Sequence, residues 1–180
     1  MAVKTFTTGE VLTASDTNTY LANSGLVFVK SQAIGTAVST VTVTSAFSST
    51  YDAYRICLYG VSCSAVTPQL RFAFGAGAAN HYGTLFYDNY IGTNAYVRSN
   101  AGNYLTVGVG DGAKSTQTEF DVFAPNLAQR TNLTGTFGGA YSGWFGGVDI
   151  SSTVFTDFTF SLSSGTYSDG TIVVYGYRKA

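Results

Sequence analysis

The sequence predicts an all-β protein, an antiparallel two-sheet sandwich of jelly-roll-like form preceded by a short N-terminal helix. After Gly25, apolar residues recur at every second position as far as the C-terminus, which is the period of strands with one buried face. Turn-forming residues divide this stretch into roughly eight to ten runs, spaced as in sandwiches. No internal repeat of about 20 to 50 residues is visible, which disfavours a propeller or a solenoid.

Composition indicates one domain with a weakly charged surface. The chain has 180 residues, of which 45% are hydrophobic and 11% are charged, against a usual charged share of about 25%. We divide it into an N-terminal segment, residues 1–25, and a sandwich domain, residues 26–180. So little charge suits a protein that covers its surface with copies of itself or with partners, although an uncharged Ser and Thr surface would look the same.

Charge and cysteine content argue against several functions. The net charge is −1 and the nine Lys and Arg residues are scattered, so we expect no nucleic-acid binding. There is no apolar signal sequence and no run of about 18 apolar residues, so we expect synthesis in a cytoplasm and no membrane insertion. With one His and two Cys, no zinc site can be assembled, and we expect no metal or cofactor. Cys57 and Cys63 are expected to be buried free thiols.

Residues 1–25 differ from the rest of the chain and predict a short helix. Thr13 is a good N-cap, Asp16 occupies the acidic position of a capping box, and Gly25 is suited to end the helix. Tyr20 and Leu21 lie within it. Because helices shorter than about a dozen residues are marginal in water, this one requires a surface to pack on, either its own sandwich or a neighbouring subunit.

The first strands are predicted at 26–30, 40–44 and 54–59. The first is a continuous apolar run, LVFVK. In 40–44, threonines alternate with valines, which gives one buried and one hydroxylated face. In 54–59, YRICLY, both faces carry bulky residues, so this strand is expected to be covered on both sides.

The middle of the chain predicts further strands. In 69–74, Leu70, Phe72 and Phe74 share one face. Residues 81–104 contain five tyrosines separated by glycines, which predicts short strands joined by turns. Residues 116–123, TQTEFDVF, are a clear strand with two chemically different faces.

The last third completes the predicted sandwich. Residues 131–147 alternate Thr, Gly and aromatics, and 158–162 place apolar side chains on one face. The sequence Ser-Asp-Gly at 168–170 indicates a hairpin turn. Residues 172–177 are expected to form a central strand, because both of its faces are apolar.

No catalytic residues are predicted. Glu119 and Asp121 share a strand face about 7 Å apart, which falls within the range for glycosidase carboxylates, but an exposed strand face explains them better. His81 is expected in a polar surface loop, and no Gly-x-Ser-x-Gly motif accompanies it. The glycine-rich stretch 107–115 is a poor phosphate loop, because Ala113 stands where glycine is needed.

Two aromatic clusters are candidate contacts for a receptor or a glycan. Tyr87, Asp88, Asn89 and Tyr90 are consecutive, and Trp144 lies among glycines in GGAYSGWFGG. Flat sugar faces stack on Trp and Tyr, while Asn and Asp hold the hydroxyl groups. The same aromatics could instead fill the sandwich core or a trimer axis.

The sequence also resembles a known class of proteins. Residues 6–21 are similar to the N-terminal segment of many tail and fibre proteins of tailed bacteriophages, and further similar blocks lie at 35–43, 47–56, 123–126 and 170–177. In the first block the matching residues are Phe6, Gly9, Glu10, Val11, Leu12, Thr13, Ala14, Asp16, Asn18 and Leu21. Residues 62–115 do not carry the resemblance, and a variable or host-facing surface is expected there.

This resemblance implies a non-enzymatic virion structural protein, a tail fibre or tail-associated subunit that contributes to host attachment. We expect a homotrimer, located in the virion (tail rather than head) after assembly in the host cytoplasm, with host surface polysaccharide as a further partner. Alternatives are a capsid decoration or head-fibre protein and, less favoured, a polysaccharide-degrading enzyme. Attachment to other virion proteins would use the N-terminal residues Phe6, Val11, Leu12, Asp16, Tyr20 and Leu21.

Overall fold

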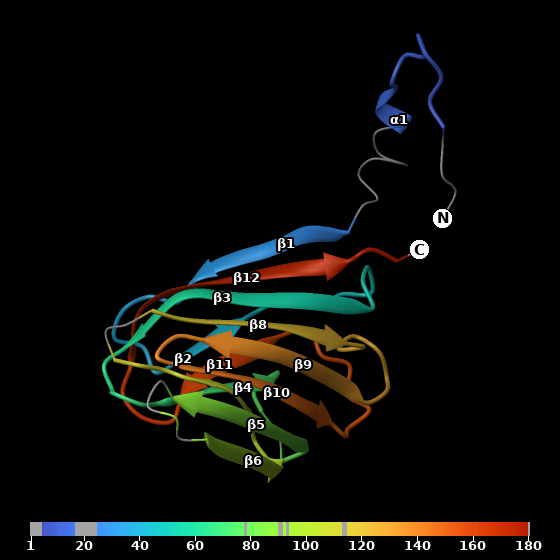
Figure 1. Cartoon of the computed structure of the whole chain (residues 1–180). Coiled ribbons are helices and arrows are strands. Elements are labelled where there is room, and N and C mark those ends of the chain that lie inside the picture. Colours follow the sequence, from blue (N-terminus) through green and yellow to red (C-terminus); the bar gives the residue numbers. More distant parts are fainter. Residues whose placement is uncertain are drawn as a thin grey trace.

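The computed structural model describes residues 5–16, 25–77, 79–89, 92, 94–112 and 115–179. Within these ranges the chain forms one short helix and twelve strands. The strands build two antiparallel sheets that pack as a sandwich (Figure 1), so the predicted fold class is confirmed.

The elements follow one another along the chain in a regular succession. They are α1 Ala14–Asp16, β1 Leu26–Ala33, β2 Thr40–Val43, β3 Ala53–Cys63, β4 Gln69–Phe74, β5 His81–Asn89, β6 Asn94–Gly102, β7 Leu105–Val109, β8 Thr116–Phe123, β9 Thr131–Gly138, β10 Tyr141–Asp149, β11 Phe158–Leu162 and β12 Tyr167–Tyr177.

The two sheets differ in size. In the described residues the large sheet has eight strands in the order β1-β12-β3-β8-β9-β10-β5-β6, which run from top to bottom in Figure 1. The small sheet has four, in the order β2-β11-β4-β7. Many connections cross from one sheet to the other, as in a jelly roll, whereas β8, β9 and β10 form a meander within the large sheet.

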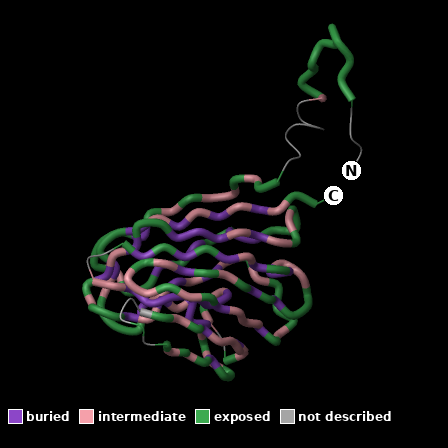
Figure 2. Tube along the Cα trace, in the orientation of Figure 1, coloured by how far each residue is buried: buried purple, intermediate pink, exposed green. Residues whose placement is uncertain are grey.

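The core lies between the sheets and is rich in aromatic rings. Along the strands, buried residues alternate with exposed ones (Figure 2), as the period-two pattern predicted. The Phe72 ring lies at the centre, with its centroid 4.9 to 5.4 Å from the centroids of Phe74, Phe120, Phe158 and Phe160. These edge-on and tilted pairs join both sheets and add to the stabilisation from burial.

The described strands outnumber the eight to ten that were predicted. The glycine-rich stretch 107–115 gave no predicted strand, but residues 105–109 form β7, which is buried along its length. A Cβ at Gly108 would lie 3.3 Å from Cγ of Phe137, a tight contact. The glycines therefore allow close packing between the sheets rather than a loop.

The hairpin predicted at 168–170 is wrong. These residues lie inside β12, where the register shifts twice, between Tyr167 and Asp169 and between Asp169 and Thr171. Gly170 has a φ of 141°, and a Cβ there would lie 2.7 Å from Cδ1 of Ile34. The Ser-Asp-Gly signal thus marks a bulge, and β12 lies between β1 and β3, an internal position as expected.

The N-terminal segment contains the predicted capping box. The backbone N–H of Thr13 donates to Oδ2 of Asp16, and the N–H of Asp16 donates to Oγ1 of Thr13, both at 3.1 Å. The described helix, α1, covers three residues, and the predicted positions Tyr20 and Leu21 lie outside the described residues. In Figure 1 residues 5–16 lie away from the sandwich, beyond the ends of β1 and β12.

Two side chains of β1 cover the open edge of β2. Nζ of Lys30 donates to the carbonyl oxygen of Thr44 at 2.6 Å, and Nε2 of Gln32 donates to that of Thr42 at 3.2 Å. Because β2 is the outermost strand of the small sheet, these contacts satisfy carbonyl groups that no neighbouring strand pairs with.

Candidate functional site

Three exposed aromatic residues form a row on the outer face of the large sheet. Trp144 of β10 pairs with Phe86 of β5, and Phe86 pairs with Tyr96 of β6. Residues paired across strands share a face, and the exposed fractions are 58% for Trp144, 41% for Phe86 and 70% for Tyr96. We call these three residues the aromatic row.

Alternation along each strand produces this row. Phe145 and Leu85, the chain neighbours of Trp144 and Phe86, are buried in the core, so the row members must point outward. The Phe86 ring lies 4.6 Å from that of Trp144 and 6.2 Å from that of Tyr96, tilted by 31° and 37°. The rings thus form a nearly continuous apolar strip that crosses three strands.

Polar side chains border the row on both sides. One hollow of about 280 Å³ lies beside Phe86 and Trp144 and also contains Asp88, Asn94 and Ser142. Another, of about 470 Å³, is lined by Thr84, Phe86, Tyr96 and Arg98. A third, of about 320 Å³, lies on the far side of Trp144 and includes Glu119 and Thr136. Hydrogen-bonding groups therefore flank the rings.

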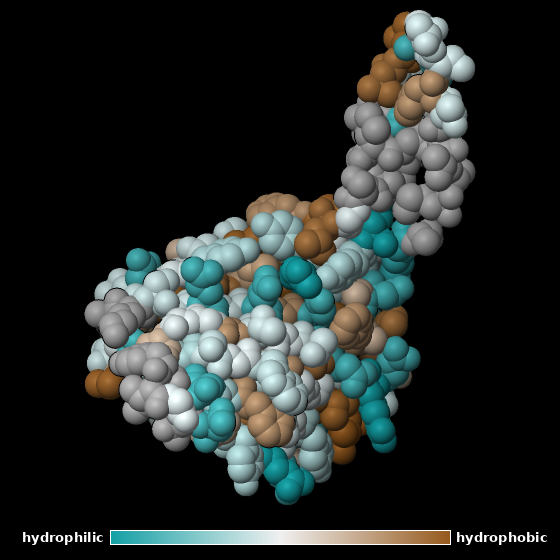
Figure 3. Space-filling view, viewed as in Figure 1, coloured by the Kyte–Doolittle hydropathy of each residue, from teal (hydrophilic) through white to brown (hydrophobic). Residues whose placement is uncertain are grey.

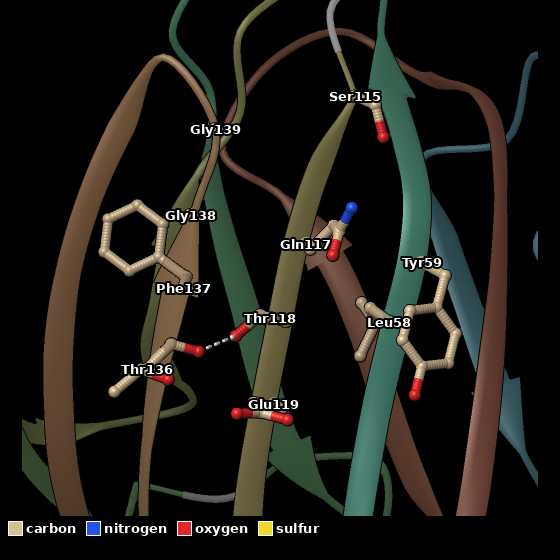
Figure 4. Close-up of a pocket in the computed structure, with 10 residues that line it drawn as sticks. All are labelled: Leu58, Tyr59, Ser115, Gln117, Thr118, Glu119, Thr136, Phe137, Gly138 and Gly139. Carbon is tan, nitrogen blue, oxygen red and sulfur yellow. Dashed lines mark hydrogen bonds between the residues drawn. The ribbon is translucent and has the colours of Figure 1, made fainter.

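A further hollow of about 480 Å³ lies between β3, β8 and β9 (Figure 4). Gln117 and Glu119 line it from β8, and Tyr59 faces it from β3. Thr118 is directed to the other side, where its hydroxyl lies 3.1 Å from the carbonyl oxygen of Thr136. Since Glu119 and Thr136 also line the hollow beside Trp144, the polar surface continues to the aromatic row.

Asp121 of β8 is held by two neighbouring strands. Nε and Nη2 of Arg55 donate to its two carboxylate oxygens at 2.9 Å each, and the Tyr177 hydroxyl donates at 2.6 Å. Burial alone would raise the pKa of Asp121, but the hydrogen bonds from Arg55 and Tyr177 and the charge of Arg55 outweigh it, and the pKa is lowered. The carboxylate is therefore ionised and neutralised by Arg55, which suits a structural clamp.

The two cysteines are free and buried, as predicted. Burial raises the pKa of the Cys57 thiol, although a hydrogen bond with Tyr59 opposes this, and burial raises that of Cys63 to about 11. The pKa of Tyr59 is raised to about 12, mainly by its hydrogen bond with Cys57. Both thiols thus stay protonated at neutral pH and are weak nucleophiles.

The predicted glycan contacts are only partly brought together. Asp88 and Trp144 line the same hollow on the outer face. Tyr87 borders that hollow too, but its half-buried ring packs against Tyr141 and Phe137, with centroids 6.0 and 6.4 Å away, so it does not join the row. Asn89 ends β5, and Tyr90 lies outside the described residues.

Sequence reasoning missed Phe86 and Tyr96. The alternation of apolar residues could have indicated them. It places Phe86 on the strand face opposite to that of the apolar Leu85, and Tyr96 on the face opposite to that of Val97. What the sequence does not contain is the strand pairing that brings Trp144 beside residues roughly fifty positions earlier.

The N-terminal residues predicted to attach to a virion are exposed. Val11 is 79% and Leu12 50% exposed, and Phe6 is exposed as well. The carboxylate of Asp16 accepts the Thr13 N–H as part of the capping box. Tyr20 and Leu21 again lie outside the described residues.

His81 was expected in a polar surface loop, but it is fully buried at the start of β5. Its Nε2 accepts the Phe74 N–H at 3.3 Å, and its Nδ1 lies 3.1 Å from the carbonyl oxygen of Gly102. Asp149 Oδ2 is 3.6 Å from Nε2. The imidazole thus links β4 of the small sheet to the large sheet, a long-range role that its local sequence does not reveal.

The described residues also bear on two other kinds of site. No group of three or more His, Cys, Asp or Glu is placed there to hold a metal ion. The described part of the chain also has no helix that is long and apolar enough to cross a membrane.

Comparisons with known proteins do not place the chain in a family. No family model and no curated protein sequence matches it. Peanut lectin bound to a nine-residue peptide matches with a TM-score of 0.30 and 8% identity, over 87% of this chain and 91% of the lectin chain. The Gt strain of infectious bursal disease virus matches with a TM-score of 0.18 and 11% identity, over 83% of this chain and 41% of the viral chain. The VP2 subviral particle of that virus gives 0.16 and 9%, over 84% and 41%. These scores are too low to carry an argument about function.

Proposed function

We propose that this protein is a non-enzymatic structural protein of a tailed-bacteriophage virion, a tail fibre or tail-associated subunit anchored through residues 1–25. The observation that carries the proposal is the exposure of Val11 and Leu12, at 79% and 50%, in a segment that lies away from the sandwich (Figure 1). Apolar side chains presented in this way suit a partner surface. Other virion proteins are the proposed partners.

The conformation of the segment supports an attachment role. The reciprocal hydrogen bonds between Thr13 and Asp16 order the chain just after Leu12. A pre-ordered segment loses less conformational entropy on docking. Its similarity to phage tail and fibre N-termini gives the proposed docking partner.

The surface of the sandwich supports a role in an assembly rather than as an isolated soluble protein. Pale residues of intermediate hydropathy dominate the view in Figure 3, with hydrophilic (teal) and hydrophobic (brown) residues scattered among them, and only 11% of the residues are charged. On the outer face, the carboxylate of Asp121 is neutralised by Arg55, and the thiol of Cys57 is protonated, as is that of Cys63 in the core. These features favour a structural over an enzymatic role.

The attachment proposal is tested by incorporation into particles. The double variant Val11→Asp/Leu12→Asp should fold normally by circular dichroism but be absent from purified virions, because charge is placed on the docking surface. Val66→Asp is the matched control, since Val66 is 74% exposed but lies in a loop of the sandwich, and it should be incorporated normally. Wild-type incorporation of the double variant would contradict the proposal.

Immunogold labelling of purified particles with an antibody to the sandwich tests the location. Gold at the tail is expected for a tail fibre or tail-associated subunit. Gold over the head would instead favour the capsid decoration or head-fibre alternative. Particles without gold would contradict a virion protein of either kind.

A further inference from the structure

We propose that the aromatic row binds an extended neutral polysaccharide, which lies across the strands of the large sheet. The inference deepens the proposed function and rests on it for the biological setting, host attachment. The binding chemistry itself is argued from the outer face alone.

The rings offer a platform of suitable shape. Trp144 and Tyr96 are each more than half exposed, at 58% and 70%, so their faces are accessible to the apolar face of a sugar ring. Neighbouring strands lie about 4.8 Å apart, and the ring centroids are 4.6 and 6.2 Å apart. At 4.6 Å and a tilt of 31°, Phe86 and Trp144 partly stack on each other. One sugar can therefore stack on the outer face of Trp144, and another can enter the hollow between Phe86 and Tyr96.

Polar groups stand where sugar hydroxyls would project. Hydroxyls leave a pyranose at its rim, and the hollows on either side of the rings hold carboxylate, amide and hydroxyl side chains. Asp88, Asn94 and Ser142 lie on one side of Trp144, and Glu119 and Thr136 lie on the other. An apolar platform with a few convergent polar groups is the usual composition of a small-ligand site.

The charges around Trp144 select a neutral glycan. Carboxylates line both hollows beside this ring, Asp88 in one and Glu119 with Asp121 in the other, and the cation Arg55 is already paired with Asp121. They would repel a uronic or sialic acid at Trp144, whereas Arg98 lines the hollow at the Tyr96 end of the row.

The experiment uses Trp144 itself, because it is the one tryptophan in the sequence. The full-length protein is titrated with soluble oligosaccharides of glucose, mannose and galactose, and with hyaluronan and polygalacturonate as acidic probes. At least one neutral oligosaccharide should give a saturable shift of the tryptophan emission. The acidic probes should give none.

Two variants test whether the row is responsible. Tyr96→Ala should weaken binding about tenfold, through loss of one stacking partner. Phe28→Ala is the matched control: Phe28 is also an exposed aromatic, at 61%, and its register through Tyr175 and Arg55 places it on the same outer face, at the β1 edge. This variant should bind as the wild type does.

Several outcomes would overturn the inference. These are no response to any neutral oligosaccharide, an equal response to the acidic probes, or equal losses in Tyr96→Ala and Phe28→Ala. If diluting the protein shifts the Trp144 emission while the particle mass falls, the row is a contact between subunits and not a glycan site. Since the titration uses free protein, a negative result leaves the particle experiments, and thus the virion proposal, standing.

Discussion

Asp121, Arg55 and Tyr177 join three adjacent strands, β8, β3 and β12, through one network of hydrogen bonds on the outer face of the large sheet. The carboxylate accepts three hydrogen bonds, at 2.6 to 2.9 Å. A bidentate Arg pair is among the stronger polar contacts in proteins. The side chains of Arg55 and Asp121 are nevertheless 35% and 21% exposed, so water screens the pair and limits its contribution to stability.

The lowered pKa of Asp121 predicts a pH-dependent contribution to stability. A carboxyl group with a lower pKa in the folded than in the unfolded state stabilises the fold above its unfolded pKa, and the effect is lost as pH falls toward the folded pKa. We expect Asp121→Asn to lower the free energy of unfolding by about 1 kcal/mol at pH 7. The deficit should shrink near pH 3, as urea unfolding at both pH values would reveal.

Glu119→Gln is the control for this effect, because Glu119 is exposed two residues earlier on the same strand and face. It should change stability little at either pH. A deficit in Asp121→Asn that is equal at pH 7 and pH 3 would mean that the ionised carboxylate is not its source.

Glycines in the strands decide how closely neighbouring elements approach. In β9, a Cβ at Gly135 would collide with Glu119 O and Cβ of Phe120 on β8. Gly138, in the same strand, has no atom within 4 Å of the corresponding position. Gly135 is thus required by close packing against β8, whereas at Gly138 only the intrinsic strand preference of glycine matters.

We predict that Gly135→Ala destabilises the protein by about 2 to 3 kcal/mol, because the added methyl group overpacks a close strand contact. Gly138→Ala should stay within about 0.5 kcal/mol of the wild type. Thermal unfolding of both variants measures the difference. Similar losses in the two would show that the cost arises from the glycine conformation in β9 and not from the contact with β8.

At the scale of elements, local alternation predicted much of the fold. The run 116–123 matches β8, and 158–162 matches β11, because an apolar period of two needs no knowledge of the partner strand. The same reasoning gave no strand at 105–109, and the hairpin predicted at 168–170 is wrong. There the glycines serve packing against Phe137 and a bulge next to Ile34, contacts with residues far away in the sequence.

The whole molecule shows why the site was harder to predict than the strands. The row exists because β10, β5 and β6 are neighbours in the large sheet. No local sequence pattern predicts that strand order or the register between the strands. Trp144 and Asp88 were predicted individually, but their common hollow, and the place of Phe86 and Tyr96 in the row, depend on the strand pairing. The burial of His81 has the same long-range origin.

The low surface charge also predicts an oligomer. Large apolar side chains such as Phe28, Phe123 and Val154 are exposed on the sandwich, which suits contacts between copies of the chain. Gel filtration with light scattering should give three times the chain mass of 18.9 kDa. A monomer at tens of micromolar would contradict the trimer, and a dimer would require a different symmetry.

Lys30 and Gln32 have a consequence for such an assembly. Many copies held at high local concentration risk joining edge to edge into fibrils, since an uncovered outer strand can template a strand of a neighbour. The carbonyl groups of Thr42 and Thr44 already accept hydrogen bonds from these two side chains. At this edge the protein can therefore be crowded without polymerising through its backbone.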